Sequence, residues 1–149
     1  MIKYISTYET LPLRSAVLRS KLPLDQCVFS SDDIDGCFHI GYFVEKRLVS
    51  IATFFPESYP DKGYGGFRLR GMATDPDYAA RGYGTKIINF AVQALTSANA
   101  AYIWCNARSS AIGFYRTLGF DIISDEFEIP DVGPHYNMIK HLTRNNTNT

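Results

Sequence analysis

Runs of β-branched and aromatic residues between polar turns predict the strands of this chain. The expected strands share this composition and cover residues 2–6, 37–44, 48–55, 67–74, 101–105, 120–127 and 135–142. The gap at residues 45–47 is short enough for a hairpin, so the strands on either side of it should pair antiparallel. Residues 101–105 are apolar throughout, which is typical of a strand buried on both faces.

Apolar residues at helical spacing predict the helices between these strands. A first helix is expected over residues 10–20, with Pro12 near its first position, and a short helix around residues 25–29. The apolar positions from Ile87 to Leu95 form one stripe of a helix over residues 85–98. This helix should therefore cover one face of a sheet.

The last expected helix begins near Ser109 and Ser110, which can cap it, and ends at Gly119. The complete order, β-α-α-β-β-β-α-β-α-β-β, is that of a layered α/β fold in which the helix over residues 85–98 joins two parallel strands by a right-handed crossover. A chain of 149 residues has the length of one domain, expected over residues 1–142. The polar residues 143–149 are expected to form a disordered tail.

Composition excludes several kinds of partner. Lys plus Arg and Asp plus Glu number 15 each, so no global field draws the chain to nucleic acid or to a membrane. Cys27, Cys37 and Cys105 are odd in number and form no C-x-x-C pair, which favours reduced thiols over disulfides or zinc, and no metal is expected. No apolar run approaches the roughly 20 residues of a membrane span. We therefore expect a cytoplasmic protein.

Residues 71–85, GMATDPDYAARGYGT, combine a strand end, a proline-bearing turn and a glycine-rich loop that opens onto a helix. Gly82 and Gly84 lack a Cβ, so a phosphate can approach the backbone, and Thr85 begins a segment whose first amides have no intrahelical partner. With the helix dipole behind them, these amides can hold a pyrophosphate. The alternative is a tight strand-to-helix turn without a ligand.

The spacing excludes two common phosphate-binding motifs. The dinucleotide motif G-x-G-x-x-G requires a small residue where Ile87 stands, and the NTPase motif G-x-x-x-x-G-K-[ST] requires a different order of Thr85 and Lys86. The ligand that carries this pyrophosphate must therefore be inferred from the rest of the chain.

Two motifs in this order of elements resemble the GNAT superfamily of N-acetyltransferases, and the resemblance extends over about the whole chain. Residues 79–84 are similar to its [QR]-x-x-G-x-[GA] loop, and residues 111–120, AIGFYRTLGF, are similar to the helix whose tyrosine faces the cofactor thiol. The segments WCNAR (104–108) and VGPHYNM (132–138) are similar to a bacterial subgroup. The resemblance implies the GNAT acyltransferase fold, with a mixed, splayed central sheet of about seven strands flanked by helices.

The resemblance also implies a reaction, the direct transfer of an acetyl group from acetyl-CoA to a primary amine of a small molecule or peptide. The residues that it assigns to the cofactor are Met72, Ala73, Thr74, Ala79, Ala80, Arg81, Gly82, Tyr83, Gly84, Thr85, Asn106 and Arg108. Ala79 departs from the usual glutamine or arginine, so that side-chain contact is lost. Whether Asn106 or Arg108 contacts the cofactor is left open by the register.

The resemblance makes Tyr115 the expected general acid, because a phenol is protonated at neutral pH and can donate to a thiolate. The alternative is that Tyr115 only packs in the core. The strand before the loop offers Arg68 and Arg70 where many relatives have a glutamate, so the base is either His135 or water. Arg70 is expected to face the acceptor and to favour an acceptor that carries a carboxylate.

Two other functions remain open from the sequence. A catalytically inactive CoA-binding regulatory module would keep the glycine loop without acceptor chemistry, and a small-molecule binding or interaction domain would use the loop only as a turn. A homodimer is one option for the assembly. Cys105 could suggest a thiol enzyme, but its apolar strand favours a buried thiol.

Overall fold

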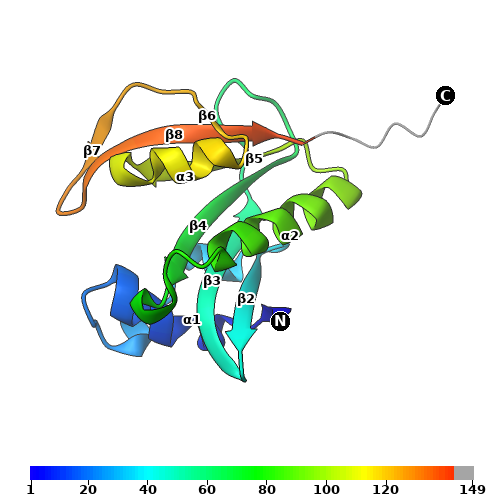
Figure 1. Cartoon of the computed structure of the whole chain (residues 1–149). Coiled ribbons are helices and arrows are strands. Elements are labelled where there is room, and N and C mark those ends of the chain that lie inside the picture. The colour runs from blue at the N-terminus through cyan, green and yellow to red at the C-terminus, as the bar shows by residue number, and fades with distance from the viewer. Residues whose placement is uncertain (143–149) are drawn as a thin grey trace. The chain divides into compact units, whose positions relative to one another are not determined.

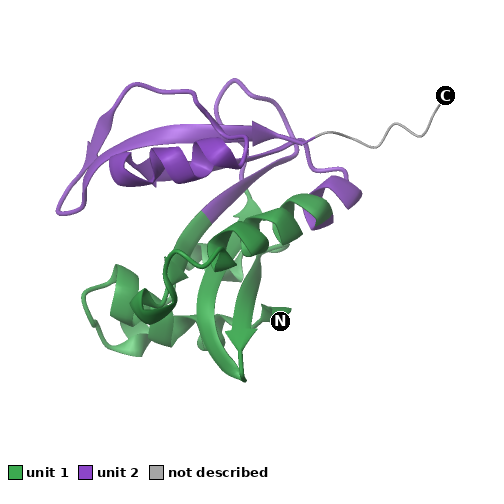
Figure 2. Ribbon diagram, in the orientation of Figure 1, with its two compact units in different colours: residues 1–56, 70–93 green, residues 57–69, 94–149 purple. Residues whose placement is uncertain are grey.

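The computed structural model describes residues 1–142 and divides them into two compact units. Figure 2 shows unit 1, which comprises residues 1–56 and 70–93, and unit 2, which comprises residues 57–69 and the chain from residue 94 onward. Strand β4 (Gly66–Thr74) and helix α2 (Tyr83–Ser97) each pass from one unit into the other. A single domain over residues 1–142 stays a prediction, and the predicted tail lies outside the described residues.

Unit 1 is built on strands β1 (Ile2–Ile5), β2 (Phe38–Val44) and β3 (Arg47–Pro56), followed in the sheet by the end of β4. Strand β2 pairs antiparallel with both β1 and β3, and Figure 1 shows β2 and β3 side by side. The β2–β3 turn consists of Glu45 and Lys46, whose φ angles are 48° and 70°. Two left-handed residues match the twist of a two-residue hairpin, so the predicted hairpin is confirmed.

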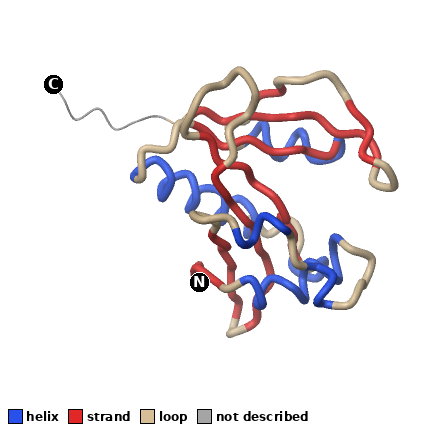
Figure 3. The backbone as a smooth tube through the Cα atoms, turned by 180° about the vertical axis from the view of Figure 1, so that it is seen from behind, coloured by secondary structure: helices blue, strands red, loops and turns tan. Residues whose placement is uncertain are grey.

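Helices cover both faces of the unit 1 sheet. Side chains alternate along a strand, so His39 and Tyr42 of β2 point to opposite faces. His39 forms a hydrogen bond with Thr7 of helix α1 (Thr7–Leu13), and Tyr42 stacks on Tyr83 of α2. Helices α1 and α2 therefore lie on opposite faces, which the view from behind in Figure 3 also shows.

The first helix begins three residues before the predicted start at Thr10. Ser6 and Glu9 form a capping box, in which each side chain accepts a hydrogen bond from the other residue's main-chain amide. This box decides the start, and Pro12 consequently lies inside the helix instead of near its first position. Since proline has no amide hydrogen to donate, the regular ladder is interrupted there, and the chain continues as a π-helical turn, η1 (Arg14–Leu18).

Unit 2 contains the start of β4 together with four further strands, β5 (Tyr102–Arg108), β6 (Asp121–Ile122), β7 (Phe127–Ile129) and β8 (Gly133–His141). Strands β4 and β5 are parallel, as predicted, and β8 pairs antiparallel with β5, β6 and β7. The single strand predicted over residues 120–127 is therefore divided in two. At the break, the Ser124 hydroxyl accepts the hydrogen bond of the Asn137 amide in place of a main-chain carbonyl.

The last helix, α3 (Ile112–Thr117), follows a 3-10 turn, η5 (Ser109–Ala111). The prediction that serines cap this helix is wrong. Ala111 occupies the N-cap without a side-chain hydrogen bond, and the Ser109 hydroxyl donates to the Pro134 carbonyl instead. Gly119, with φ of 90°, ends the helix as predicted. No helix within residues 1–142 combines the length and the apolar character needed to cross a bilayer.

A buried ion pair holds the segment between α1 and β2, which contains the 3-10 turns η2 (Leu24–Cys27) and η3 (Ser30–Asp33). Both side chains are 0% exposed, and Arg14 donates from Nη1 and Nη2 to the two carboxylate oxygens of Asp32 at 2.7 and 2.9 Å. Arg14 also donates to the Cys27 carbonyl and the Thr53 hydroxyl, at 3.1 and 2.9 Å. The pair therefore joins the helix, the connecting segment and strand β3.

We expect Asp32→Asn to lower the free energy of unfolding by about 3–5 kcal/mol, because it leaves the Arg14 charge buried without its partner. Chemical denaturation at neutral pH measures this change. The matched control is Asp33→Asn, at an exposed position of the same 3-10 turn, which should change stability by less than about 0.5 kcal/mol.

The pH dependence of the stability difference between the wild type and Asp32→Asn provides a second test. Burial raises the pKa of Asp32, but the hydrogen bonds from Arg14 and the Phe29 amide and the charge of Arg14 together lower it below the ordinary 3.8. The wild-type advantage should therefore be complete well above pH 3.8 and should shrink as the pH falls below that value. Equal stability of the wild type and Asp32→Asn at neutral pH would contradict the role of the pair.

Candidate active site

The glycine-rich loop follows the end of β4 directly. The Asp75 side chain accepts a hydrogen bond from the Asp77 amide and caps a short 3-10 turn, η4 (Pro76–Tyr78). Ala80 and Gly82 then adopt left-handed φ angles of 60° and 84°. Two such residues so close together reverse the chain, so that it enters α2 at Tyr83.

Helix α2 begins two residues before the predicted start at Thr85. The Lys86 amide already donates to the Gly82 carbonyl at 3.1 Å, so the amides without intrahelical partners are those of Tyr83, Gly84 and Thr85. A Cβ at Gly82 would meet no atom within 4 Å, and residues 79–82 are exposed. The loop before the helix N-terminus is thus accessible, and its binding of an anion stays a prediction.

Basic and aromatic side chains surround this helix start. The guanidinium carbons of Arg47 and Arg81 lie 5.5 and 5.2 Å from the centre of the Tyr78 ring. Tyr83 stacks on Tyr42 with 4.6 Å between ring centres, and Lys86 lies 5.4 Å from the Tyr42 ring. Arg47 is held by Asp75 at 2.8 Å. The surroundings of the loop are therefore suited to a polyphosphate with an aromatic base.

The end of β4 departs from regular strand geometry. The parallel ladder of β4 and β5 stops at Leu69 and Cys105. Two residues later Gly71 has φ of 66°, a left-handed angle outside the regular strand range, which changes the direction of the following peptide groups. The main chain at residues 72–74 is therefore directed differently from the ladder before it. This segment is the one predicted to bind the cofactor arm.

In unit 2, Asn106 and Arg108 lie within β5, whereas the sequence prediction placed them after a strand ending at residue 105. The strand extends to Arg108 because it pairs with β8 along its whole length, up to the pair Arg108 and His135. The Asn137 side-chain amide donates to Asn106 Oδ1 at 2.6 Å, and the Tyr59 hydroxyl donates to Asn137 Oδ1 at 2.8 Å. Asn106 is thus held in one orientation, with its own amide group left to donate.

The connection that carries Tyr59 is fastened to β5. The Tyr102 hydroxyl accepts from the Tyr59 amide at 2.8 Å and donates to the Gly63 carbonyl at 2.9 Å, while Trp104 Nε1 donates to the Glu57 carbonyl at 2.8 Å. Sequence analysis did not identify this network, since nothing in the spacing of Tyr59, Tyr102 and Asn137 indicates that they meet.

Tyr115 lies on α3 and is only 7% exposed. Burial, followed by the electrostatic influence of the nearby Cys105, raises its pKa well above the ordinary value of 10. The phenol therefore stays protonated at physiological pH. Burial likewise raises the pKa of Cys105 to about 12, against a lowering by Arg68, so this thiol is a protonated core residue, in agreement with the preferred interpretation of the sequence.

His135 is buried on β8, and its Nδ1 lies 2.8 Å from the Gly133 carbonyl oxygen. A carbonyl can only accept, so Nδ1 carries the proton and Nε2 is the basic nitrogen. The two units thus divide the predicted site residues between them. Unit 1 contains Arg70, residues 72–74 and residues 79–85, and unit 2 contains Asn106, Arg108, Tyr115 and His135.

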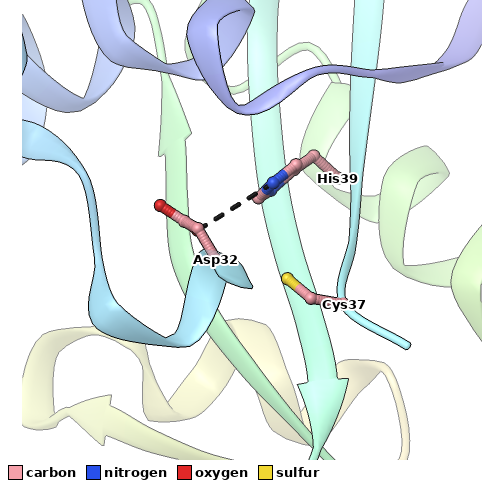
Figure 4. Close-up of side chains that lie close together, drawn as sticks. All are labelled: Asp32, Cys37 and His39. Atoms are coloured by element: carbon pink, nitrogen blue, oxygen red, sulfur yellow. Dashed lines mark ion pairs between the residues drawn. The ribbon is translucent and has the colours of Figure 1, made fainter. Parts of the chain in front are cut away.

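One group of side chains has the composition of a metal site. Oxygen, sulfur and nitrogen atoms of Asp32, Cys37 and His39 lie within 4.8 Å of one another, as Figure 4 shows. Arg14 already binds both Asp32 oxygens, and both His39 nitrogens face threonine hydroxyls at 2.9 and 2.7 Å. Burial and the charge of Asp32 raise the pKa of Cys37 to about 11, so its thiol is protonated. The group is therefore a satisfied hydrogen-bond cluster that does not suit a cation.

Comparison with known proteins identifies the class of this fold. A sequence profile described as the acetyltransferase (GNAT) family matches residues 5–120. The chain is 37% identical over 142 residues to the uncharacterized N-acetyltransferase YitI of Bacillus subtilis (strain 168), covering 95% of both proteins. An aminoglycoside 6'-N-acetyltransferase complexed with coenzyme A has a similar structure, with a TM-score of 0.77 at 13% identity, covering 96% of this chain and 97% of that one. The ribosomal-protein-S18-alanine N-acetyltransferase from Escherichia coli gives 0.75 at 17% identity, covering 100% and 97%.

The family match and the Bacillus subtilis relative thus define an N-acetyltransferase of the kind that uses acetyl-CoA. The chain belongs to the acetyltransferase (GNAT) family. The predicted fold class, a mixed and splayed sheet flanked by helices, is confirmed. By their names the two solved relatives act on an aminoglycoside and on a ribosomal protein, so the shared fold leaves the acceptor unidentified.

The loop offers a matched pair of glycine substitutions. Gly82 and Gly63 both have φ of 84°, and a Cβ at either would meet no atom within 4 Å. Gly82→Ala and Gly63→Ala should therefore lower stability equally, by about 1–2 kcal/mol. Only Gly82→Ala should weaken coenzyme A binding, by about 10-fold or more, because it disturbs main-chain donors to a charged ligand. Calorimetric titration with coenzyme A measures the difference, and equal affinities of the two variants would exclude the loop as the diphosphate site.

Proposed function

We propose that this protein transfers the acetyl group of acetyl-CoA directly to a primary amine of a small molecule or peptide. The observation that carries the proposal is the exposed start of α2, where three main-chain amides without intrahelical partners follow the left-handed Gly82. An N-terminus of this kind binds phosphate groups through main-chain donors and the helix dipole.

Each part of the cofactor has a proposed position on unit 1. The diphosphate is bound by residues 79–85, mainly through the main chain, because Ala79 supplies no polar side chain. The exposed Arg81 lies two residues further along the chain. The two amides of the pantetheine arm hydrogen-bond to residues 72–74 as an additional strand would. Asn106, through its free amide group, and Arg108, through its exposed guanidinium, are the proposed contacts from unit 2.

The chemistry requires that charge be stabilised at two places. Negative charge develops on the thioester carbonyl oxygen when the neutral amine attacks, and the Met72 amide, just after the left-handed Gly71, is the proposed donor to it. The departing sulfur needs a proton, and Tyr115, which burial keeps protonated, is the proposed donor. The proton that the amine loses goes to His135 Nε2 or to water.

We expect Tyr115→Phe to reduce kcat by about 10²- to 10⁴-fold while the affinity for acetyl-CoA stays the same, because only proton donation is lost. The assay measures free thiol release with a panel of amines, amino acids and antibiotics. Tyr102→Phe is the matched control, since it also removes a buried phenol oxygen but one that bonds only to the 57–65 connection. Full turnover of Tyr115→Phe would remove this residue from the reaction and leave it a core residue.

The role of His135 can be tested by the pH dependence of kcat/KM. A general base must be unprotonated to act, so a base in this role gives the profile of kcat/KM an acid limb. His135→Gln should remove this acid limb and lower kcat/KM at neutral pH. A limb that stays at the same pH in the variant would favour deprotonation by water.

The same assay distinguishes the two other functions. A CoA-binding regulatory module would show a raised melting temperature with coenzyme A but no thiol release with any acceptor. A domain that uses the loop only as a turn would show neither. The cytoplasm is the proposed compartment, because the three cysteines are free thiols.

A further inference from the structure

Three arginines surround one aromatic ring in unit 1. The guanidinium carbons of Arg14, Arg70 and Arg19 lie 3.8, 4.2 and 5.9 Å from the centre of the Phe29 ring. Phe29 itself is 6% exposed, so the ring is a fixed support for the guanidinium groups. Stacking on an aromatic face restricts an arginine to a narrow set of orientations. We call Arg14, Arg19, Phe29 and Arg70 the arginine cluster.

Arg19 brings uncompensated positive charge to the arginine cluster. Asp32 binds Arg14 with both carboxylate oxygens. Within residues 1–142, no carboxylate oxygen lies within 4.0 Å of a side-chain nitrogen of Arg19. His39, whose Nε2 lies 3.9 Å from Asp32 Oδ1, contributes no charge at neutral pH, because burial lowers its pKa. Arginine stays charged at physiological pH, so the cluster has an excess of positive charge.

Two polar atoms of the arginine cluster are also shielded from water without a partner. The Nε atoms of Arg14 and Arg19 are buried and have no hydrogen-bond acceptor, and the whole Arg14 residue is 0% exposed. Unsatisfied buried donors are rare and costly in folded proteins, and an acceptor such as a water, an ion or a ligand group would satisfy them. An acceptor that also carries negative charge would in addition offset the positive charge of Arg19.

The arginine cluster contacts strand β4, which carries Met72, the proposed donor to the thioester oxygen. A Cβ at Gly71 would lie 2.8 Å from the Phe29 ring and 3.6 Å from Arg14 Nε, so the cluster contacts the main chain of β4 at Gly71. Gly71 directly precedes Met72, the proposed donor to the thioester oxygen, and the diphosphate loop lies further along the chain at residues 79–85. The cluster therefore borders Met72 on its N-terminal side, whereas the residues proposed for the cofactor begin at Met72 and continue toward the C-terminus.

We infer that the acceptor is an amine that also carries a carboxylate, and that Arg19 and Arg70, oriented on the Phe29 ring, bind this carboxylate. The inference rests on the proposed function and names the substrate class of the same site. Arg70 and Met72 are two strand positions apart, roughly 6–7 Å, a separation that suits an amino acid or the acidic end of a peptide. Aminoglycosides and polyamines, which are polycations, are repelled by the same charges.

The experiment compares L-amino acids with the corresponding amino acid amides as acceptors, using acetyl-CoA and thiol release. The wild type should prefer each acid over its amide. Arg19→Gln and Arg70→Gln should lower kcat/KM for the acids by about 10- to 100-fold, the size expected for a lost hydrogen bond to a charged group, and should change the amides little. Arg70→Lys should restore part of the preference, because it keeps the charge and loses the planar fork.

Arg116→Gln is the matched control, because Arg116 is an exposed arginine of α3 whose removal changes the net charge by the same amount. It should leave the preference unchanged, and the KM for acetyl-CoA should be the same in all four variants. Melting temperatures identify any variant that fails to fold. In that case the preference for acids over amides is compared between the wild type and Arg70→Lys, the least disruptive change.

Equal turnover of acids and amides, or efficient turnover of polyamines, would overturn the inference and leave the transferase function intact. Absence of thiol release with every amine would instead count against the proposed function. In that case calorimetric binding of N-acetyl amino acids decides the inference separately. Binding that Arg19→Gln weakens would support it, and absence of binding would overturn it.

Discussion

The buried ion pair of Arg14 and Asp32 is the interaction on which unit 1 depends most. It lies entirely out of water, so its charges stabilise the fold only while both are present and their hydrogen bonds are complete. Through it, helix α1, the connection to β2 and strand β3 keep a fixed geometry. The same pair holds Asp32 against the Phe29 amide, and this contact positions the ring beside β4. A structural ion pair and the proposed acceptor site thus share one residue, Arg14.

Glycine conformation provides the second constraint. Gly71 allows Phe29 to approach the β4 main chain, and Gly82 turns the chain into α2. Both residues have left-handed φ angles that other residues adopt only with strain. The site is accordingly made of main-chain groups more than of polar side chains. The proposed donors to a diphosphate are main-chain amides, so they do not depend on the side chain of Ala79.

Local signals in the sequence predicted most of the fold. The hairpin at Glu45 and Lys46, the glycine end of α3 and the apolar stripe of α2 each depend on a few neighbouring residues, and each was found where expected. Boundaries failed where two local signals competed. The capping box of Ser6 and Glu9 prevailed over Pro12, and the extra length of β5 follows from pairing with β8, which the sequence of β5 alone does not encode.

The candidate site was only partly predictable for the same reason. Motif spacing identified the loop and Tyr115, because each lies within one short segment. The arginine cluster combines a helix, a connection and a strand, and the Tyr59, Asn106 and Asn137 network combines a connection and two strands. Such groups arise from long-range packing, and of their members only Arg70 and Asn106 were singled out beforehand.

The attachment of the 57–65 connection to β5 has a dynamic consequence. Surface connections usually exchange their amide hydrogens quickly, because little protects them. Here one phenol oxygen of a core strand receives the Tyr59 amide and also binds the Gly63 carbonyl. Opening this connection breaks both hydrogen bonds of the Tyr102 hydroxyl. We therefore expect the 57–65 connection, although its sequence is that of a loop, to be as rigid as strand β5, to which it is attached.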